Sequence, residues 1–171
     1  MVYLGETELA ILVALVQNVK PTVMIEIGCQ LGRTAKVILN NVPTLVRYVG
    51  IDVPWSHQPT LACQRSETPA LPGLYAKDDP RFYLYLQPTQ TIPELEQCDA
   101  VFIDGDHSSA AVLHDSHLAF ACVRPGGIIV WHDVGNTGVE VTPVIDQFIT
   151  EGWPIEKVPN TWLAYWCRPR G

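Results

Sequence analysis

The sequence has few basic residues, and they form no cluster. Eleven Lys and Arg stand against eighteen Asp and Glu, which gives a formal net charge of −7 with the five His counted as neutral. Proteins that bind duplex nucleic acid need clustered cations to contact the phosphates. The scattered cations therefore predict that no nucleic acid is a partner of this protein.

Cysteine-pair motifs and targeting signals are also lacking. The five Cys are widely spaced and include no Cys-x-x-Cys, which argues against a disulfide scaffold or a zinc ribbon and suits a reducing compartment. Residues 1–8 lack the basic region and cleavage site of a signal peptide. The apolar stretch Leu9 to Val16 is too short to cross a bilayer. We expect a cytoplasmic protein without a membrane partner.

The composition is that of a folded domain. Of the 171 residues, 47% are hydrophobic and 17% are charged, enough to bury a core and too few charges for a disordered chain. We find no repeat, linker or low-complexity tract. One domain over residues 1–171 is expected, with an N-terminal helix within 1–20 and a sheet with helices within 22–168.

Apolar runs of strand length alternate with helical patterns along the chain. Helices are predicted over 6–19, 31–40, 92–96, 108–123 and 142–151, and strands over 22–27, 47–51, 81–86, 100–103, 128–131, 155–158 and 162–166. Such alternation predicts an α/β fold with a mostly parallel sheet covered on both faces. Pro159-Asn160-Thr161 predicts a closing hairpin, and hence one antiparallel strand. The proline-rich residues 53–79 are expected to be mostly loop with at most one short helix.

Two glycines follow the first predicted strand. Gly28 and Gly32 sit where an open α/β sheet binds its ligand, and glycine permits sharp turns and close approach of a ligand. Gln30 breaks the G-x-G-x-x-G pattern and no Gly-Lys-Ser/Thr follows, so a pyrophosphate cradle is disfavoured. Asp52 ends the second strand, where its carboxylate can accept both hydroxyls of a ribose. A plain turn and a surface Asp are the alternative.

Polar residues follow the fourth and fifth predicted strands. Asp104 comes directly after one strand, and His132 and Asp133 come after the other. These strand ends face the same crevice in a parallel sheet, so the three side chains can converge. Two carboxylates and an imidazole suit a divalent cation, Mg²⁺ through oxygen or Mn²⁺, Fe²⁺ or Zn²⁺ through the imidazole as well. The alternatives are a structural role for the acids and a hydrogen-bonding or merely strand-end role for His132.

Further candidates lie near these strand ends. His107 has an ordinary pKa near ~6.5, which suits a general base, although a cofactor or structural contact is the alternative. Asp106 is a candidate helix cap. Asp115 either supports the site or faces solvent. The Trp55 ring either covers a bound base or is buried in packing. We expect no catalytic role for three further histidines, His57, His114 and His117.

Four segments resemble one enzyme family. The run MIEIGCQLGRTA is similar to the first motif of class I S-adenosylmethionine-dependent methyltransferases, and YVGID is similar to their second-strand motif. FIDGDH and VRPGGIIVWHD, separated by a helix, resemble the small-molecule O-methyltransferase subgroup with a DGxH motif. The resemblance covers roughly residues 5 to 168. The chain departs from many relatives at Ser109, where they have an aromatic residue, and at residues 87–90, where they have an adenine-binding Gly-Asp/Ser loop.

This resemblance implies a Rossmann-like three-layer sandwich with a seven-stranded sheet whose last strand is antiparallel. It implies O-methylation of a small-molecule hydroxyl with S-adenosylmethionine, with His107 as the base and Asp104 and Asp133 holding Mg²⁺ as in metal-dependent relatives. In full, the site implied by the motifs and the strand ends comprises catalytic His107 and Asp104, cofactor-binding Glu26, Gly28, Gly32, Thr34, Asp52 and Asp104, and metal-binding Asp104, His132 and Asp133.

Two other functions remain open from the sequence. A non-catalytic module that binds a nucleoside or a partner is the main alternative, and a nicotinamide oxidoreductase is disfavoured by the absent G-x-G. The acceptor is not specified by the sequence and could be a sugar, a phenol or a polyketide. The apolar opening helix could pack against a second copy, so a homodimer is a further expectation.

Overall fold

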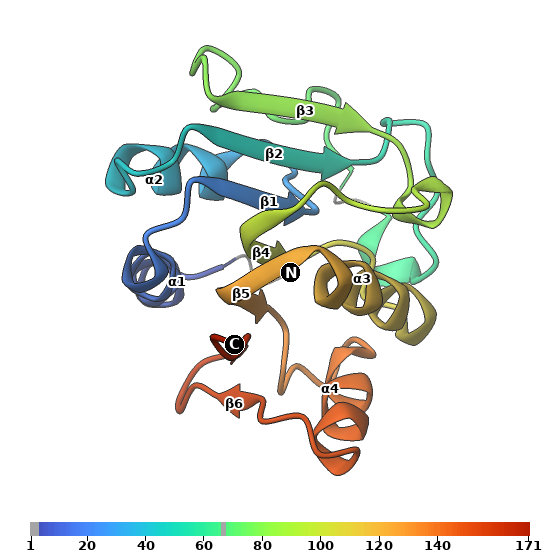
Figure 1. Ribbon diagram of the computed structural model, residues 1–171. Coiled ribbons are helices and arrows are strands. Elements are labelled where there is room, and N and C mark those ends of the chain that lie inside the picture. The colour runs from blue at the N-terminus through green and yellow to red at the C-terminus, as the bar shows by residue number, and fades with distance from the viewer. Residues whose placement is uncertain (1–3, 66–67) are drawn as a thin grey trace.

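The computed structural model describes residues 4–65 and 68–171, which form a twisted seven-stranded sheet between two helical layers (Figure 1). The sheet order is β3-β2-β1-β4-β5-β7-β6. The strands are β1 (Val23–Ile27), β2 (Arg47–Asp52), β3 (Phe82–Leu86), β4 (Cys98–Ile103), β5 (Val123–Trp131), β6 (Glu156–Lys157) and β7 (Ala164–Cys167). Neighbours from β3 to β5 are parallel, while β7 is antiparallel to both β5 and β6. The predicted three-layer α/β fold with an antiparallel hairpin strand is confirmed.

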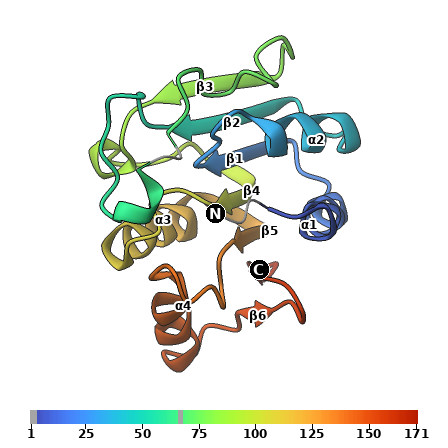
Figure 2. The ribbon, with the colours of Figure 1, turned by 180° about the vertical axis from the view of Figure 1, so that it is seen from behind.

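The helices divide between the two faces of the sheet (Figures 1 and 2). One face carries α1 (Glu6–Val19) and α2 (Arg33–Asn41), and the other carries α3 (Ser109–Cys122) and α4 (Val141–Thr150). Two short 3₁₀ turns are η1 (Ala62–Gln64) and η2 (Thr89–Thr91). Within the part of the chain that the structure describes, every helix is too short or too polar to span a membrane.

Successive residues of the central strands enter two separate cores. On β1, Met24 packs with the α1 and α2 side, whereas Ile25 packs with the α3 and α4 side. Phe102 and Val101 of β4 divide in the same way. Because side chains alternate across a strand, a sheet covered on both faces needs apolar residues at nearly every position. This explains the continuous apolar runs and fixes the strand ends at one edge.

Two predicted elements differ from the structure. The helix expected over 92–96 is absent, and this segment is irregular after η2; it contains Pro93, which lacks an N–H, and only Ile92 is buried. The fifth strand begins at Val123 rather than 128, because Val123 pairs with Cys98 and the following residues 124–127 form an irregularity before Ile128 pairs with Ala100. The other predicted elements end within two residues of the observed bounds.

Candidate functional site

A cavity of about 790 Å³ opens at the carboxyl ends of the parallel strands. This volume falls in the range of about 300–1,000 Å³ that is typical of small-molecule sites. Gly32 does not line the cavity, but caps α2 with a φ of 77°. The other predicted site residues all line it: Glu26, Gly28, Thr34, Asp52, Asp104, His107, His132 and Asp133. The structure therefore brings together nearly the whole set that the sequence indicated.

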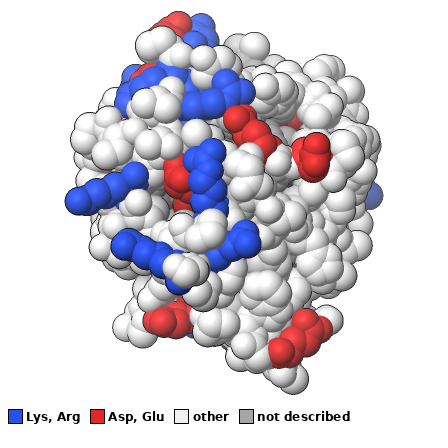
Figure 3. Space-filling view, in the orientation of Figure 1, with Lys and Arg blue, Asp and Glu red and all other residues white. Residues whose placement is uncertain are grey.

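The lining of the cavity is acidic. Arg33 is its one Lys or Arg among the described residues, and this side chain is paired with Glu6 at 2.9 Å. Elsewhere, Lys and Arg side chains gather on the left part of the face in Figure 3, with Asp and Glu between some of them. An acidic cavity favours ligands that carry positive charge or hydroxyl groups over anionic ones.

Gly28 allows β1 and β4 to approach closely at the floor of the cavity. Its φ is +86°, and a Cβ atom here would fall against the carbonyl oxygen of Asp104. The Gly28 N–H donates to the carbonyl of Ile51 at 2.8 Å, and the Asp104 N–H donates to the carbonyl of Ile27 at 2.8 Å. This glycine therefore sets the position of Asp104 as well as the turn.

Asp52 is not a free surface carboxylate. Its Oδ2 accepts the backbone N–H of Gln30 at 2.6 Å, and its Oδ1 accepts the N–H of Val53 at 2.7 Å. Burial raises the pKa of Asp52, while these two backbone hydrogen bonds oppose the rise. The thiol and backbone N–H of Cys29 also interact with this carboxylate, so a ligand hydroxyl would share its two oxygens with these donors. Asp52 thus shapes the glycine loop and still presents acceptors to the cavity.

Glu26 is almost completely buried, with 1% of its surface exposed. Burial raises its pKa to about 8, while the hydrogen bond donated by the Tyr48 hydroxyl at 2.9 Å opposes the rise and the charges of Asp104 and Asp52 add to it. A carboxyl group with this pKa is mostly protonated at neutral pH. Glu26 therefore brings a polar group to the cavity without adding a full negative charge.

Glu26→Gln is expected to remove a pH dependence of stability. In the unfolded chain Glu26 ionises near its ordinary pKa of 4.5, whereas in the folded chain it keeps its proton up to about pH 8. Wild-type stability should therefore fall as pH rises through this window, by up to roughly 1.4 kcal/mol per pH unit from this group. Urea unfolding between pH 5 and 9 checks this. The free energy of unfolding of Glu26→Gln, relative to that of exposed Glu94→Gln, should rise with pH. If the two variants showed the same dependence of stability on pH, Glu26 would not be protonated in the folded chain.

Carboxylates and imidazoles alternate at the ends of β4 and β5. His107 Nε2 lies 3.3 Å from Asp104 Oδ1, and His107 Nδ1 lies 3.4 Å from Asp133 Oδ2. His132 Nδ1 lies 3.1 Å from Asp104 Oδ1 and 3.4 Å from Asp133 Oδ2. Glu8 Oε2 lies 3.4 Å from His132 Nε2. We call Glu8, Asp104, His107, His132 and Asp133 the acid–imidazole cluster.

The members of this cluster shift each other's pKa values. Burial alone would raise the pKa of Asp104, but the charge of His132 and hydrogen bonds from His107 and His132 lower it to about 2. Burial alone would lower the pKa of His132, but Asp104 and Asp133 raise it to about 11. At neutral pH Asp104 is therefore ionised and His132 is protonated, so opposite charges alternate inside the cavity.

The donor set fits a divalent cation. One ligand atom each from Asp104, His107 and Asp133 lie within 4.8 Å of one another. His132, which the sequence placed in this set, has Nδ1 beside Asp104 and Asp133, in hydrogen-bonding positions rather than in this group of three. Two carboxylates and an imidazole suit Mn²⁺, Fe²⁺ or Zn²⁺, or Mg²⁺ with several waters.

Gln64 is a site residue that the sequence did not indicate. It lies on η1, within the irregular segment between β2 and β3, and is buried. Its Nε2 donates to the Gly105 carbonyl at 3.0 Å, and its Oε1 accepts the His107 N–H at 2.9 Å. Asp106 accepts the N–H groups of Ser108 at 2.9 Å and Thr60 at 3.2 Å. The segment between β2 and β3 is therefore fastened to the backbone that carries His107.

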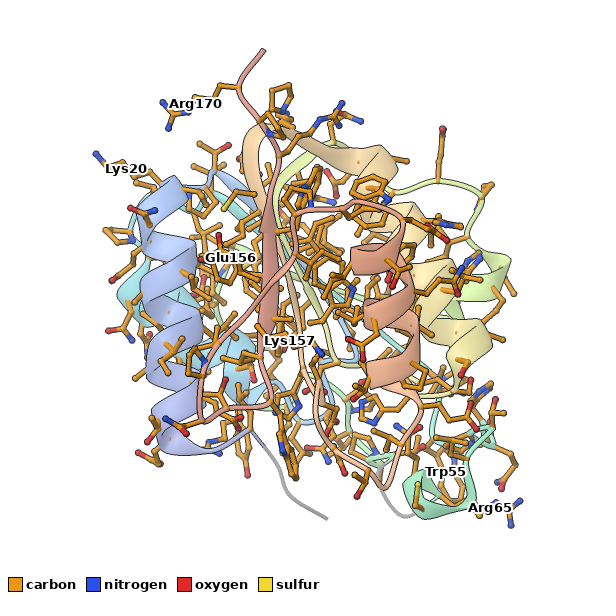
Figure 4. The ribbon with its side chains drawn as sticks, turned by 90° about the horizontal axis from the view of Figure 1, so that it is seen from below. Lys20, Trp55, Arg65, Glu156, Lys157 and Arg170 are labelled. Carbon is orange, nitrogen blue, oxygen red and sulfur yellow. The ribbon has the colours of Figure 1, made fainter. Side chains whose placement is uncertain are left out.

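Three other expectations can be placed. Asp115 lines the cavity with 1% of its surface exposed, and burial raises its pKa to about 6, so it does not face solvent. Trp55 is 71% exposed and outside the cavity lining, so it neither covers the site nor packs in the core. Figure 4 shows Trp55 at the same end of the molecule as Arg65. Residues 87–90 all line the cavity.

Comparisons with known proteins agree with the sequence motifs. A family model described as a methyltransferase domain matches residues 25–134. Among solved structures, SAH-bound Podospora anserina methyltransferase is 14% identical with a TM-score of 0.71, the alignment covering 98% of this chain and 80% of that one. The Bacillus cereus O-methyltransferase in complex with SAH is 16% identical, with a TM-score of 0.65 and coverages of 97% and 83%.

A third solved structure has the same fold. It is the SAM complex of a Streptomyces achromogenes O-methyltransferase involved in tomaymycin synthesis, at 16% identity, a TM-score of 0.62 and coverages of 99% and 82%. Among curated protein sequences, none matches the chain. The family model spans more than half of the chain and includes the glycine loop, Asp104 and Asp133. The chain belongs to the methyltransferase domain family of S-adenosylmethionine-dependent enzymes.

Proposed function

We propose that this protein transfers a methyl group from S-adenosylmethionine (SAM) to a hydroxyl oxygen of a small molecule. The observation that carries the proposal is one cavity in which the glycine loop and Asp52 face the acid–imidazole cluster. The three structural neighbours hold SAM or SAH, and two of them are named O-methyltransferases. SAM supplies a methyl group already activated by its sulfonium, so the protein must align an oxygen and remove one proton.

The cofactor half of the cavity is built by the ends of β1 and β2. Backbone of the glycine loop and Thr34 would border the methionine part, and Asp52 would accept the ribose hydroxyls. Glu26 and Asp104 lie at the floor of this region. SAM carries a sulfonium and an ammonium group, and the acidic lining suits both charges.

The acceptor half of the cavity is built by the ends of β4 and β5. We assign His107 as the base that takes the hydroxyl proton, and Asp104 and Asp133 as the groups that hold its ring from both sides. Their contacts with the ring are 3.3 and 3.4 Å, longer than strong hydrogen bonds. An acceptor hydroxyl can therefore replace one of them and bond to a ring nitrogen, with the other contact keeping the ring oriented.

A divalent cation is the second part of the proposal. Asp104 and Asp133 would hold it, with the His107 ring beside them. When bound, a cation at this position would lower the pKa of the acceptor hydroxyl. The residues themselves would fix the direction from which the hydroxyl approaches, because their backbones follow directly from β4 and β5.

Binding of the cofactor is the first test of this function. Calorimetric titration is expected to give micromolar dissociation constants for SAM and for its product, S-adenosylhomocysteine (SAH). No detectable binding of either compound would contradict the proposal. Binding without methyl transfer to any hydroxylated compound would instead support a non-catalytic nucleoside-binding module.

Removal of metal tests the second part separately. Treatment with EDTA is expected to abolish methyl transfer, and addition of Mg²⁺ or Mn²⁺ should restore it, because the acids at the acceptor would then lack their cation. The affinity for SAH, measured in the same samples, should change little. Turnover that survives EDTA unchanged would exclude metal assistance while leaving methyl transfer intact.

A further inference from the structure

Glu8 brings the N-terminal helix into contact with the acid–imidazole cluster. It lies in the first turn of α1, at the opposite end of the helix from Lys20, which Figure 4 labels. Its Oε1 accepts the Trp162 N–H at 2.6 Å. Its Oε2 accepts the Gly5 N–H at 3.2 Å and lies 3.4 Å from His132 Nε2. One carboxylate thus joins α1, the segment before β7 and the end of β5.

His132 is held from opposite sides by carboxylates. Its ring is 2% exposed and packs near the rings of Phe102 and Trp162, with centroid distances of 6.5 and 6.4 Å. Nε2 faces Glu8, while Nδ1 faces Asp104 and Asp133. A buried ring fixed at both nitrogens has one orientation, and here that orientation places Nδ1 against both acids of the acceptor half.

We propose that Glu8 is a positioning residue for methyl transfer, acting on Asp104 and Asp133 through His132. Without this carboxylate, Nε2 would lose the contact that holds it among the described residues 4–65 and 68–171, and the ring could turn away from the two acids. Displacements of about 1 Å in a reacting constellation can cost about 10²-fold in rate. This inference rests on the proposed function, because the two acids matter in this way only if they serve the acceptor.

A structural role for Glu8 is the competing explanation, since its carboxylate also accepts the Gly5 and Trp162 N–H groups. Glu8→Gln separates the bond to Trp162, which uses Oε1, from the contacts of Oε2 with Gly5 and His132. The amide oxygen can still accept the Trp162 N–H, whereas the amide nitrogen is a donor and cannot accept from His132. Removing a residue that orients another functional side chain typically costs about 10–100-fold in activity.

The kinetic arm compares Glu8→Gln and Glu8→Asp with wild type. We expect Glu8→Gln to lower kcat about 10–100-fold, with KM and the SAH dissociation constant within about twofold and a small fall in the melting temperature from the lost Gly5 bond. Glu8→Asp keeps the charge and should recover part of the rate. Glu94→Gln, an exposed residue outside the cavity lining, is the matched control with wild-type kinetics. An unchanged kcat in Glu8→Gln would overturn the proposal.

The spectroscopic arm does not depend on turnover. The ring ¹⁵N resonances of His132, assigned by their loss in His132→Gln, should shift in Glu8→Gln and stay in place in Glu94→Gln. Unmoved resonances in Glu8→Gln would overturn the contact itself. A wild-type enzyme that transfers no methyl group would contradict the proposed function instead, while shifted resonances would still establish that Glu8 orients His132.

Discussion

His107→Gln is expected to lower kcat by about 10²–10⁴-fold, the range typical of a lost general base. Glutamine keeps polar atoms near Asp104 and Asp133 but cannot take a proton at neutral pH. The SAH dissociation constant should change little, because the cofactor half of the cavity is built by β1 and β2. Initial rates and calorimetry on the same preparations provide the measurement.

His117→Gln supplies the control for that experiment. His117 is exposed on α3, where its ring lies 5.9 Å from that of Phe148, and it does not line the cavity. Wild-type kinetics are expected for this variant. If His107→Gln retained a wild-type kcat, another group would have to remove the proton. The pH–rate profile of His107→Gln would then report the pKa of that group.

Gly28→Ala is expected to destabilise the fold by several kcal/mol. A positive φ at a residue with a Cβ costs about 1–3 kcal/mol, and a Cβ here would collide with the backbone of Asp104 and force a shift that costs about 1–3 kcal/mol more. Urea unfolding measures the loss. The folded fraction of Gly28→Ala should also transfer methyl groups more slowly, because the collision moves Asp104.

Gly152→Ala isolates the conformational part of that cost. Gly152 has a φ of +96°, yet a Cβ there would meet no atom within 4 Å. The variant should therefore lose only the smaller amount, about 1–3 kcal/mol, that the backbone conformation demands. Equal losses in the two variants would mean that β1 and β4 can separate without penalty at Gly28.

The strand ends were predictable because two patterns coincide there. Asp104 and Asp133 each follow an apolar run, and parallel strands present their carboxyl ends at one edge, so convergence follows from the topology alone. Asp52 was indicated in the same way. Its hydrogen bonds to the glycine loop were not, since they depend on how that loop folds back onto β2.

Glu8 and Gln64 show where sequence reasoning stops. Glu8 reads as an ordinary acid at a helix start, and its contact with His132 spans 124 residues. Gln64 lies in a proline-rich segment without periodicity, so no local pattern marks its hydrogen bonds to Gly105 and His107. The helix predicted over 92–96 is wrong for a different reason. Its few apolar residues suggested a helical period, but Pro93 interrupts it.

The bond from the Trp162 N–H to Glu8 has a consequence for how the protein acquires its site. The two residues are 154 positions apart, so this contact closes a loop that contains most of the chain. Closing long loops carries an entropic cost and slows folding. During synthesis, this hydrogen bond can form only after Trp162 has left the ribosome. We therefore expect the acid–imidazole cluster to gain its final geometry late, after the parallel part of the sheet has formed.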